Sequence, residues 1–153
     1  MSIVTDLQIK EYLQEKKQLP RGFKPELKNK KKYNSFEAEA LGDNGNSFKL
    51  IVRQSKTNAL DFSVILGVMI DGSLFRLKRY NGTSHDHTNK IERTRFSGFH
   101  IHAATQRYQE NGFQEDGFAE HTVRYSDWKS AMEQMVRENN FVMDVDRNQK
   151  RLV

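Results

Sequence analysis

Four of the five histidines in this chain lie within residues 85–102, in two pairs of the form His-x-His. His85 and His87 form the first pair, and His100 and His102 form the second. An unperturbed imidazole has a pKa of about 6.5, so it can accept or donate a proton near neutral pH. Imidazole nitrogens are also common zinc ligands. The two pairs therefore indicate a site that works either by proton transfer or by binding a metal ion.

Proton transfer by histidines suits metal-independent cleavage of a phosphodiester, with RNA as the natural substrate. The RNA 2′-hydroxyl is an internal nucleophile that needs a base, and the departing 5′-oxygen needs an acid. We expect His100 and His102 to be this acid–base pair, or one of them to act with His85 or His87 across the site. All four are candidate catalytic residues of a ribonuclease-like protein, and this hypothesis requires no cofactor.

Basic and aromatic side chains lie on both sides of the histidines and could bind the nucleic acid. Arg79 or Arg95 would contact the phosphate, because a guanidinium stabilises the charge that develops there. Tyr80, Arg107 and Tyr108 could orient a base or a phosphate. The full set of predicted nucleic-acid-binding residues is Arg76, Lys78, Arg79, Tyr80, Arg93, Arg95, Arg107 and Tyr108.

A metal site is the second hypothesis. Zinc or another divalent metal would be bound by His85, His87, His100 and His102. Asp86 could add an oxygen ligand. The chain has no cysteine, which excludes thiolate ligands, and four histidines without cysteine suit a catalytic site better than a structural one. This alternative predicts a metal-dependent hydrolase.

A basic N-terminal segment supports a third, non-catalytic hypothesis. Residues 16–32 contain both prolines and could be flexible, and the first 32 residues carry the whole excess of positive charge in a chain of pI about 9.4. Clustered positive charge is typical of proteins that bind polyanions. Such a binding protein or inhibitor, of the kind that mobile elements encode against host defences, would act on a nucleic acid or nucleoprotein. It would depend on Lys28, Lys30, Lys31 and Lys32, whereas the enzyme hypotheses depend on His100 and His102.

The hydrophobic pattern predicts the elements that would position these residues. Thr5 and Gln8 fit a capping box at the start of an N-terminal helix. Alternating apolar residues then predict an antiparallel meander of about five strands, including a hairpin over 36–52 and a central strand over 61–70. A short helix is expected near 103–111, and a C-terminal helix near 126–138, capped by Ser126. The fold class is therefore α+β.

Two geometries fit the second histidine pair. In a strand, His100 and His102 share one face while Ile101 points into the core. In a helix opened by Ser97, His100 would instead share a stripe with Arg107. The clean period of two favours the strand. His121 stands alone in another predicted strand, and we interpret it as an ordinary polar residue.

The return strand after residue 72 should bring basic side chains close to the histidines. Its alternation places Arg76, Lys78 and Tyr80 together on the face opposite the core. Residues 81–98, between this strand and the second histidine pair, are rich in turn formers.

Global properties bound these hypotheses. At 153 residues the chain fits a single domain, residues 1–153. The absence of cysteine suits a reducing cytoplasm. No apolar run approaches the roughly 20 residues needed to span a bilayer, and the N-terminus lacks the pattern of a signal peptide. We therefore expect a cytoplasmic protein without a membrane partner.

A local resemblance agrees with the first hypothesis. "RYNGTSHDHTN" followed by "FHIH" resembles the histidine-rich segment of TumE-type toxins of bacterial toxin–antitoxin modules, although the spacer between the histidine pairs is longer here and there is extra material at both ends. The matching positions are Arg79, Tyr80, Asn81, His85, His87, His100 and His102. The resemblance implies a small α+β toxin, of a toxin–antitoxin or phage-defence module, that acts on RNA or translation and binds an antitoxin. "GFHIHAATQRYQENGF" is also similar to an uncharacterised bacterial and phage small-protein family, which implies no activity.

Overall fold

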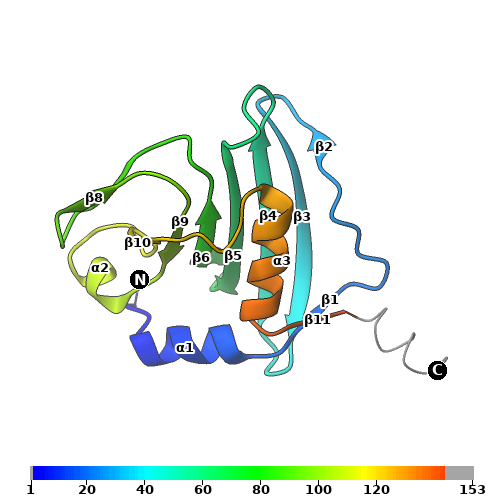
Figure 1. Ribbon diagram of the computed structural model, residues 1–153. Helices are drawn as coiled ribbons and strands as arrows, with labels where there is room; N and C mark the ends of the chain where they lie inside the picture. The colour runs from blue at the N-terminus through cyan, green and yellow to red at the C-terminus, as the bar shows by residue number, and fades with distance from the viewer. Residues whose placement is uncertain (1, 144–153) are drawn as a thin grey trace.

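Within the described part of the chain, a nine-stranded sheet and a separate two-stranded ribbon dominate the fold, with three helices around them (Figure 1). The computed structural model describes residues 2–143. The predicted single domain over 1–153 therefore includes residue 1 and residues 144–153, which lie outside the described residues. No helix in the described range is long and apolar enough to cross a membrane.

The centre of the sheet is a four-stranded antiparallel meander. It consists of β3 (Tyr33–Gly42), β4 (Ser47–Ser55), β5 (Phe62–Ile70) and β6 (Ser73–Asn81). Beyond β6 the sheet continues through β9 (His100–Ala103) to β10 (Phe118–His121). Beyond β3 lie β1 (Lys17–Leu19), β2 (Lys28–Asn29) and β11 (Phe141–Met143). The ribbon is β7 (His87–Asn89) with β8 (Thr94–Phe96), and the helices are α1 (Asp6–Gln14), α2 (Gln106–Glu110) and α3 (Trp128–Glu138).

The mixed α+β class is confirmed, but a meander of about five strands is wrong. The predicted hairpin and central strand are present as β3–β5, and they form the middle of a larger sheet. The strands that were missed have only two or three residues each, too few to show alternation. One of them, β1, pairs in parallel with β11 from the other end of the described chain. Such pairing depends on distant partners and leaves no local pattern.

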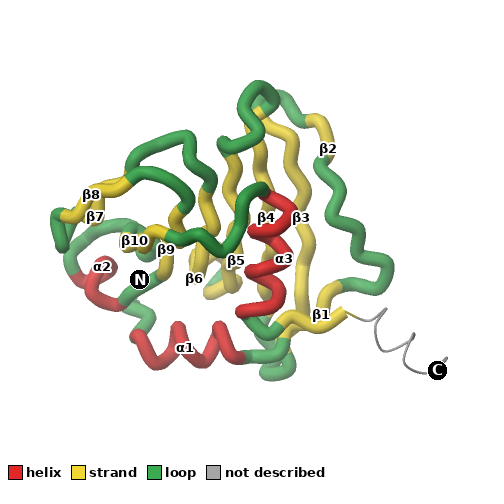
Figure 2. The backbone as a smooth tube through the Cα atoms, viewed as in Figure 1, coloured by secondary structure: helices red, strands yellow, loops and turns green. Residues whose placement is uncertain are grey.

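The hydrophobic core lies between the meander and α3. Val52, Val64 and Leu66 are fully buried on the strands, and Met135 is fully buried on the helix. Figure 2 shows α3 lying over the meander and running along its strands, with α1 along one end of the sheet. One face of the sheet is thus covered by α3, and the side chains on the opposite face are not part of this core.

The helix ends follow side-chain capping. The capping box of Thr5 and Gln8 is confirmed at α1. At α3 the predicted Ser126 cap is wrong, because Asp127 accepts the hydrogen bond from the backbone N–H of Ser130. The short helix α2 begins at Gln106 rather than 103, since β9 continues to Ala103 and Thr105 caps the helix.

A β-bulge at Leu66 and Gly67 changes which face the residues of β6 occupy. Lys78 pairs with Leu66, on the face covered by α3, whereas Arg76 pairs with Gly67 on the opposite face. The prediction that Arg76, Lys78 and Tyr80 share one face is therefore wrong, because the extra residue shifts the alternation by one. The same shift places Arg79 on the face opposite α3.

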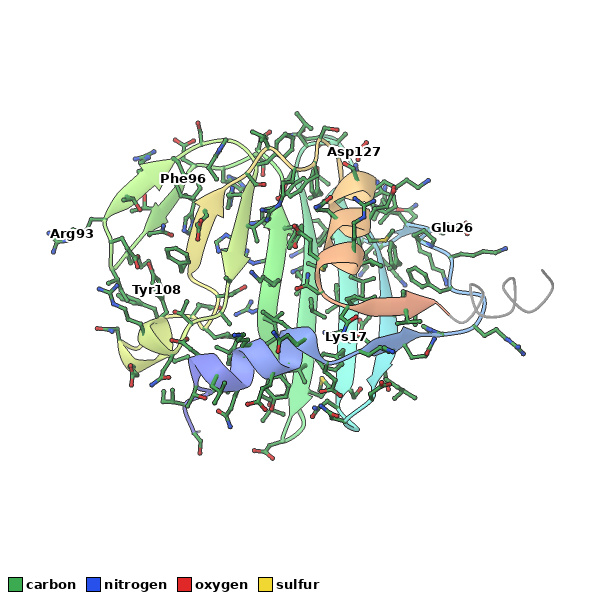
Figure 3. All side chains as sticks on the ribbon, turned by 60° about the horizontal axis from the view of Figure 1, so that its bottom comes forward. Lys17, Glu26, Arg93, Phe96, Tyr108 and Asp127 are labelled. Atoms are coloured by element: carbon green, nitrogen blue, oxygen red, sulfur yellow. The ribbon has the colours of Figure 1, made fainter. Side chains whose placement is uncertain are left out.

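A buried lysine joins the two ends of the described chain. Lys17 is fully buried, and its ammonium donates to the carbonyls of Leu13, Glu15 and Asn139 at 2.8–2.9 Å. It also lies over the ring of Phe48, 4.7 Å from the centroid. Figure 3 shows Lys17 where α1 leads into the strands near β11. A buried charge with three carbonyl acceptors is satisfied, so this lysine is a structural tie.

Replacing this lysine should destabilise the fold. Lys17→Met keeps the length of the side chain but leaves three carbonyls without their donor, so we expect a loss of about 2–4 kcal/mol. Urea denaturation measures it, and Lys16→Met, at the exposed neighbouring position, is the matched control. Equal unfolding midpoints for the two variants would contradict the structural role.

Candidate metal centre

Three histidines meet on the sheet face opposite α3. His100 and His102 project from β9, where they pair with Asn81 and Arg79 of β6. His87 arrives from β7, which is held against β10 by the side chain of Asn89. That amide donates to the carbonyl of Ala119 and accepts from its N–H, both at 2.8 Å. These two hydrogen bonds hold the ribbon against the sheet, and they therefore also fix the position of His87.

The three imidazoles are in direct contact. The ring centroids are 4.6 Å apart for His87 and His102, 5.1 Å for His100 and His102, and 5.5 Å for His87 and His100. One ring nitrogen from each lies within 4.8 Å of those of the other two. Tetrahedral zinc, with bonds of 2.0–2.1 Å, would place these nitrogens about 3.3 Å apart.

Backbone carbonyls fix the tautomers of the two buried histidines. Nδ1 of His100 is 2.9 Å from the carbonyl oxygen of Gly98, and Nδ1 of His102 is 2.8 Å from that of Asp116. A carbonyl oxygen only accepts, so each Nδ1 carries the proton and each Nε2 is left bare. A bare nitrogen is the form that binds a metal ion.

The third tautomer is fixed by Asn89. The side-chain nitrogen of Asn89 donates to the carbonyl of Ala119, and the side-chain oxygen accepts from the N–H of Ala119. These two bonds identify the atom that lies 2.8 Å from Nε2 of His87 as the oxygen of Asn89. Nε2 of His87 is therefore the donor, and its Nδ1 is bare. All three histidines thus have one nitrogen held as a donor and one available as a ligand, as in known second-shell arrangements around metals.

Burial keeps the β9 pair neutral. His100 and His102 are each 4% exposed. Burial lowers the pKa of His102 far below its ordinary value, and the nearby Arg79 charge lowers it further. The pKa of His100 is also lowered, mainly by burial and then by His87 and Arg79, against the opposing hydrogen bond to Gly98. Neutral imidazoles bind metals well, but they cannot serve as general acids at neutral pH.

A buried ion pair stands behind His102. Asp116 is fully buried; its backbone carbonyl accepts from His102, and its carboxylate accepts from Arg79 Nε at 3.0 Å. The second carboxylate oxygen has no hydrogen bond within the described residues, although Arg76 Nε is 3.7 Å away. Asp116 therefore sets both the orientation of one histidine and the position of the cation beside it.

A cavity of about 300 Å³ opens next to the cluster. Phe96 of β8, labelled in Figure 3, packs against His87 and His100, with ring centroids 5.6 and 5.7 Å away. The cavity wall combines the polar side chains of Arg79, His85 and Lys90 with the rings of Tyr108 and Phe113. The cluster thus packs against an aromatic ring and borders the cavity.

Three of the four predicted histidines come together, and the fourth does not. His85 is exposed and lines the cavity without joining the cluster. Asp86 forms an exposed ion pair with Arg95 at 3.0 Å, so it is not placed as an oxygen ligand. His121 is exposed on β10, opposite His100, and also lies outside the cluster.

The predicted nucleic-acid-binding residues do not form a single patch. Lys78 and Tyr80 lie on the face covered by α3, and Tyr108 is buried with its hydroxyl bonded to Glu92. Arg93 is exposed at the tip of the ribbon (Figure 3). The remaining arginines each pair with a carboxylate: Arg76 with Glu115, Arg79 with Asp116, Arg95 with Asp86 and Arg107 with Glu92.

Sequence reasoning missed the groups that orient the histidines. Asn89 follows His87 at a spacing of two, so recognition of a strand there would have placed both on one face. Gly98 and Asp116 act on the histidines through backbone carbonyls. A backbone contact leaves no residue-type signal.

Comparisons with protein-family models, curated proteins and solved structures found no match. The resemblance to TumE-type toxins therefore stays a prediction, and the inferences below depend on the site itself.

The buried histidines should make the metal-free protein acid-sensitive. In the unfolded chain a histidine gains a proton as the pH falls through about 6.5, whereas folded His102 stays neutral. Stability is therefore complete above that pH and declines below it, by about 1.4 kcal/mol per pH unit for each such histidine. Urea denaturation in EDTA at pH 7.5, 6.5 and 5.5 should show a flatter profile for His102→Gln. His121→Gln should keep the wild-type slope, and equal slopes in all three proteins would contradict the assignment.

Proposed function

We propose that His87, His100 and His102 bind one divalent metal ion, preferably zinc, and that the protein is a metal-dependent hydrolase. Two observations support this. One ring nitrogen of each histidine lies within 4.8 Å of those of the other two, and each ring has one nitrogen held by a hydrogen bond, which leaves its other nitrogen bare. Imidazole suits zinc among the common metals, and three protein ligands are typical of catalytic zinc sites, which keep a fourth position open.

The cavity next to the cluster supports a catalytic role. When bound, the ion would polarise a substrate oxygen and lower the pKa of a water molecule. His85 lines the cavity and is exposed, so it can pass protons between the site and solvent. Arg79 also lines the cavity, where its guanidinium can stabilise negative charge on the substrate.

Metal-independent cleavage by His100 and His102 is less well supported. That mechanism needs one imidazole protonated at neutral pH, and burial together with the charge of Arg79 opposes protonation of both. Burial instead keeps both imidazoles neutral, which is the form that binds a metal ion.

Metal binding is the direct test. Isothermal titration of the EDTA-treated protein with Zn²⁺ should give one site, and Co²⁺ should give the intense visible spectrum of a tetrahedral centre. His100→Ala/His102→Ala should lose both signals. Hydrolysis of bis(p-nitrophenyl) phosphate should be abolished by EDTA and restored by Zn²⁺.

The other two histidines provide matched controls. His121→Ala and His85→Ala should keep the binding stoichiometry, because neither belongs to the cluster. His85→Ala should lower the hydrolysis rate by about 10²-fold or more if it transfers protons. Equal Zn²⁺ binding by the wild type and His100→Ala/His102→Ala would overturn the proposed centre, and cleavage resistant to EDTA would restore the acid–base mechanism.

A further inference from the structure

A second, larger groove of about 810 Å³ lies beside the central strands. Apolar side chains that line it include Phe23, Ile51, Ile65 and Leu74. Its cations are Lys24, Lys28, Lys30, Arg53 and Arg76, and its carboxylates are Glu26 and Glu37. The groove therefore combines an apolar surface with an excess of positive charge.

Most of this positive charge is unpaired. Within residues 2–143, no ion pair joins Lys28, Lys30 or Arg53 to a carboxylate, and all three side chains are exposed. Of the two carboxylates, Glu37 is already paired with Lys49 at 3.0 Å. The groove is thus electrostatically complementary to an anion.

The groove and the histidine cluster share one face of the sheet. Cross-strand partners have side chains on the same face, and one row of partners runs from Arg53 through Ser63 and Asn81 to His100. The adjacent row runs from Glu37 through Ile51, Ile65 and Arg79 to His102. Three steps between strands separate Arg53 from His100, roughly 14 Å at the usual strand spacing.

We propose that the groove binds single-stranded nucleic acid and leads one of its phosphodiesters to the metal centre. This inference rests on the proposed function, and it names the substrate of that site. Lys28, Lys30 and Arg53 would contact phosphates, while the apolar side chains of Ile51 and Leu74 would contact unpaired bases. Arg79 pairs with His102 across β6 and β9 and so lies beside the histidine cluster.

A single strand fits this surface better than a duplex. In a duplex the base faces are stacked on each other, so an apolar floor has nothing to contact. The separation between the groove and the histidines also requires a ligand of several nucleotides, comparable to the site sizes of about 4–16 nucleotides that other single-strand-binding surfaces occupy.

The test combines ligand length with charge neutralisation. Fluorescence anisotropy would measure binding of labelled RNA and DNA single strands of 2, 4, 8 and 12 nucleotides to the zinc-loaded protein. Affinity should rise with length and then level off, and the 12-mer should bind at least tenfold more tightly than the dinucleotide. Lys30→Gln/Arg53→Gln should weaken 12-mer binding about tenfold and lower kcat/KM for its cleavage, with unchanged hydrolysis of bis(p-nitrophenyl) phosphate.

A charge-matched control separates the groove from net charge. Lys10→Gln/Lys129→Gln removes two exposed cations from α1 and α3, away from the groove, and should bind the 12-mer like the wild type. Equal losses in both double variants would overturn the inference, as would a dinucleotide that binds as tightly as the 12-mer. Equally tight binding of polyglutamate would overturn it in favour of an acidic protein partner.

The outcomes for the two proposals can be distinguished. Zinc binding and hydrolysis of the small diester, without any effect of Lys30→Gln/Arg53→Gln on the 12-mer, would overturn the groove and leave the metal centre intact. Absence of zinc binding would overturn the metal centre and the delivery of a phosphodiester to it, even if the groove still bound the 12-mer.

Discussion

The candidate site depends on the pairing of one side-chain amide with one backbone position. Asn89 exchanges two hydrogen bonds with Ala119 and uses the same oxygen to orient His87. It is buried, so these bonds form where water does not compete, and an unmade partner would be costly. This contact, together with the packing of His87 on His102 and of Phe96 on His100, holds the ribbon over β9 and β10. Loss of the Asn89 side chain would remove the hydrogen bond that orients His87.

The chemistry of the cluster follows from the protonation state of its three histidines. Each histidine donates to an oxygen that can only accept, and two of the rings are removed from water. Desolvation and the guanidinium of Arg79 both disfavour the imidazolium form. Burial keeps the imidazoles neutral, which makes them poor acids and leaves them in the form that binds a metal ion. Burial therefore decides between the two kinds of chemistry that histidine can perform.

The two faces of the sheet carry different kinds of side chain. The face under α3 holds the apolar core, together with the ring of Tyr80 stacked on Tyr125. The opposite face carries the histidines, the Arg79–Asp116 pair and the basic groove. The bulge at Leu66 and Gly67 maintains this division on β6, because it moves Lys78 to one face and leaves Arg76 and Arg79 on the other. A continuous array of polar and cationic side chains therefore crosses several strands.

The sequence alone determined the central strands, the α1 capping box and the placement of His100 and His102 on one face. Those features follow from local alternation and capping, which depend on neighbours a few residues away. Only the tertiary structure decided that His87 joins the pair while His85 does not, and that Asp116 supports His102. It also decided that the predicted basic residues divide between two faces. These outcomes depend on a bulge, on backbone carbonyls and on pairing between distant segments. Such features cannot be recognised from the residue types along the chain.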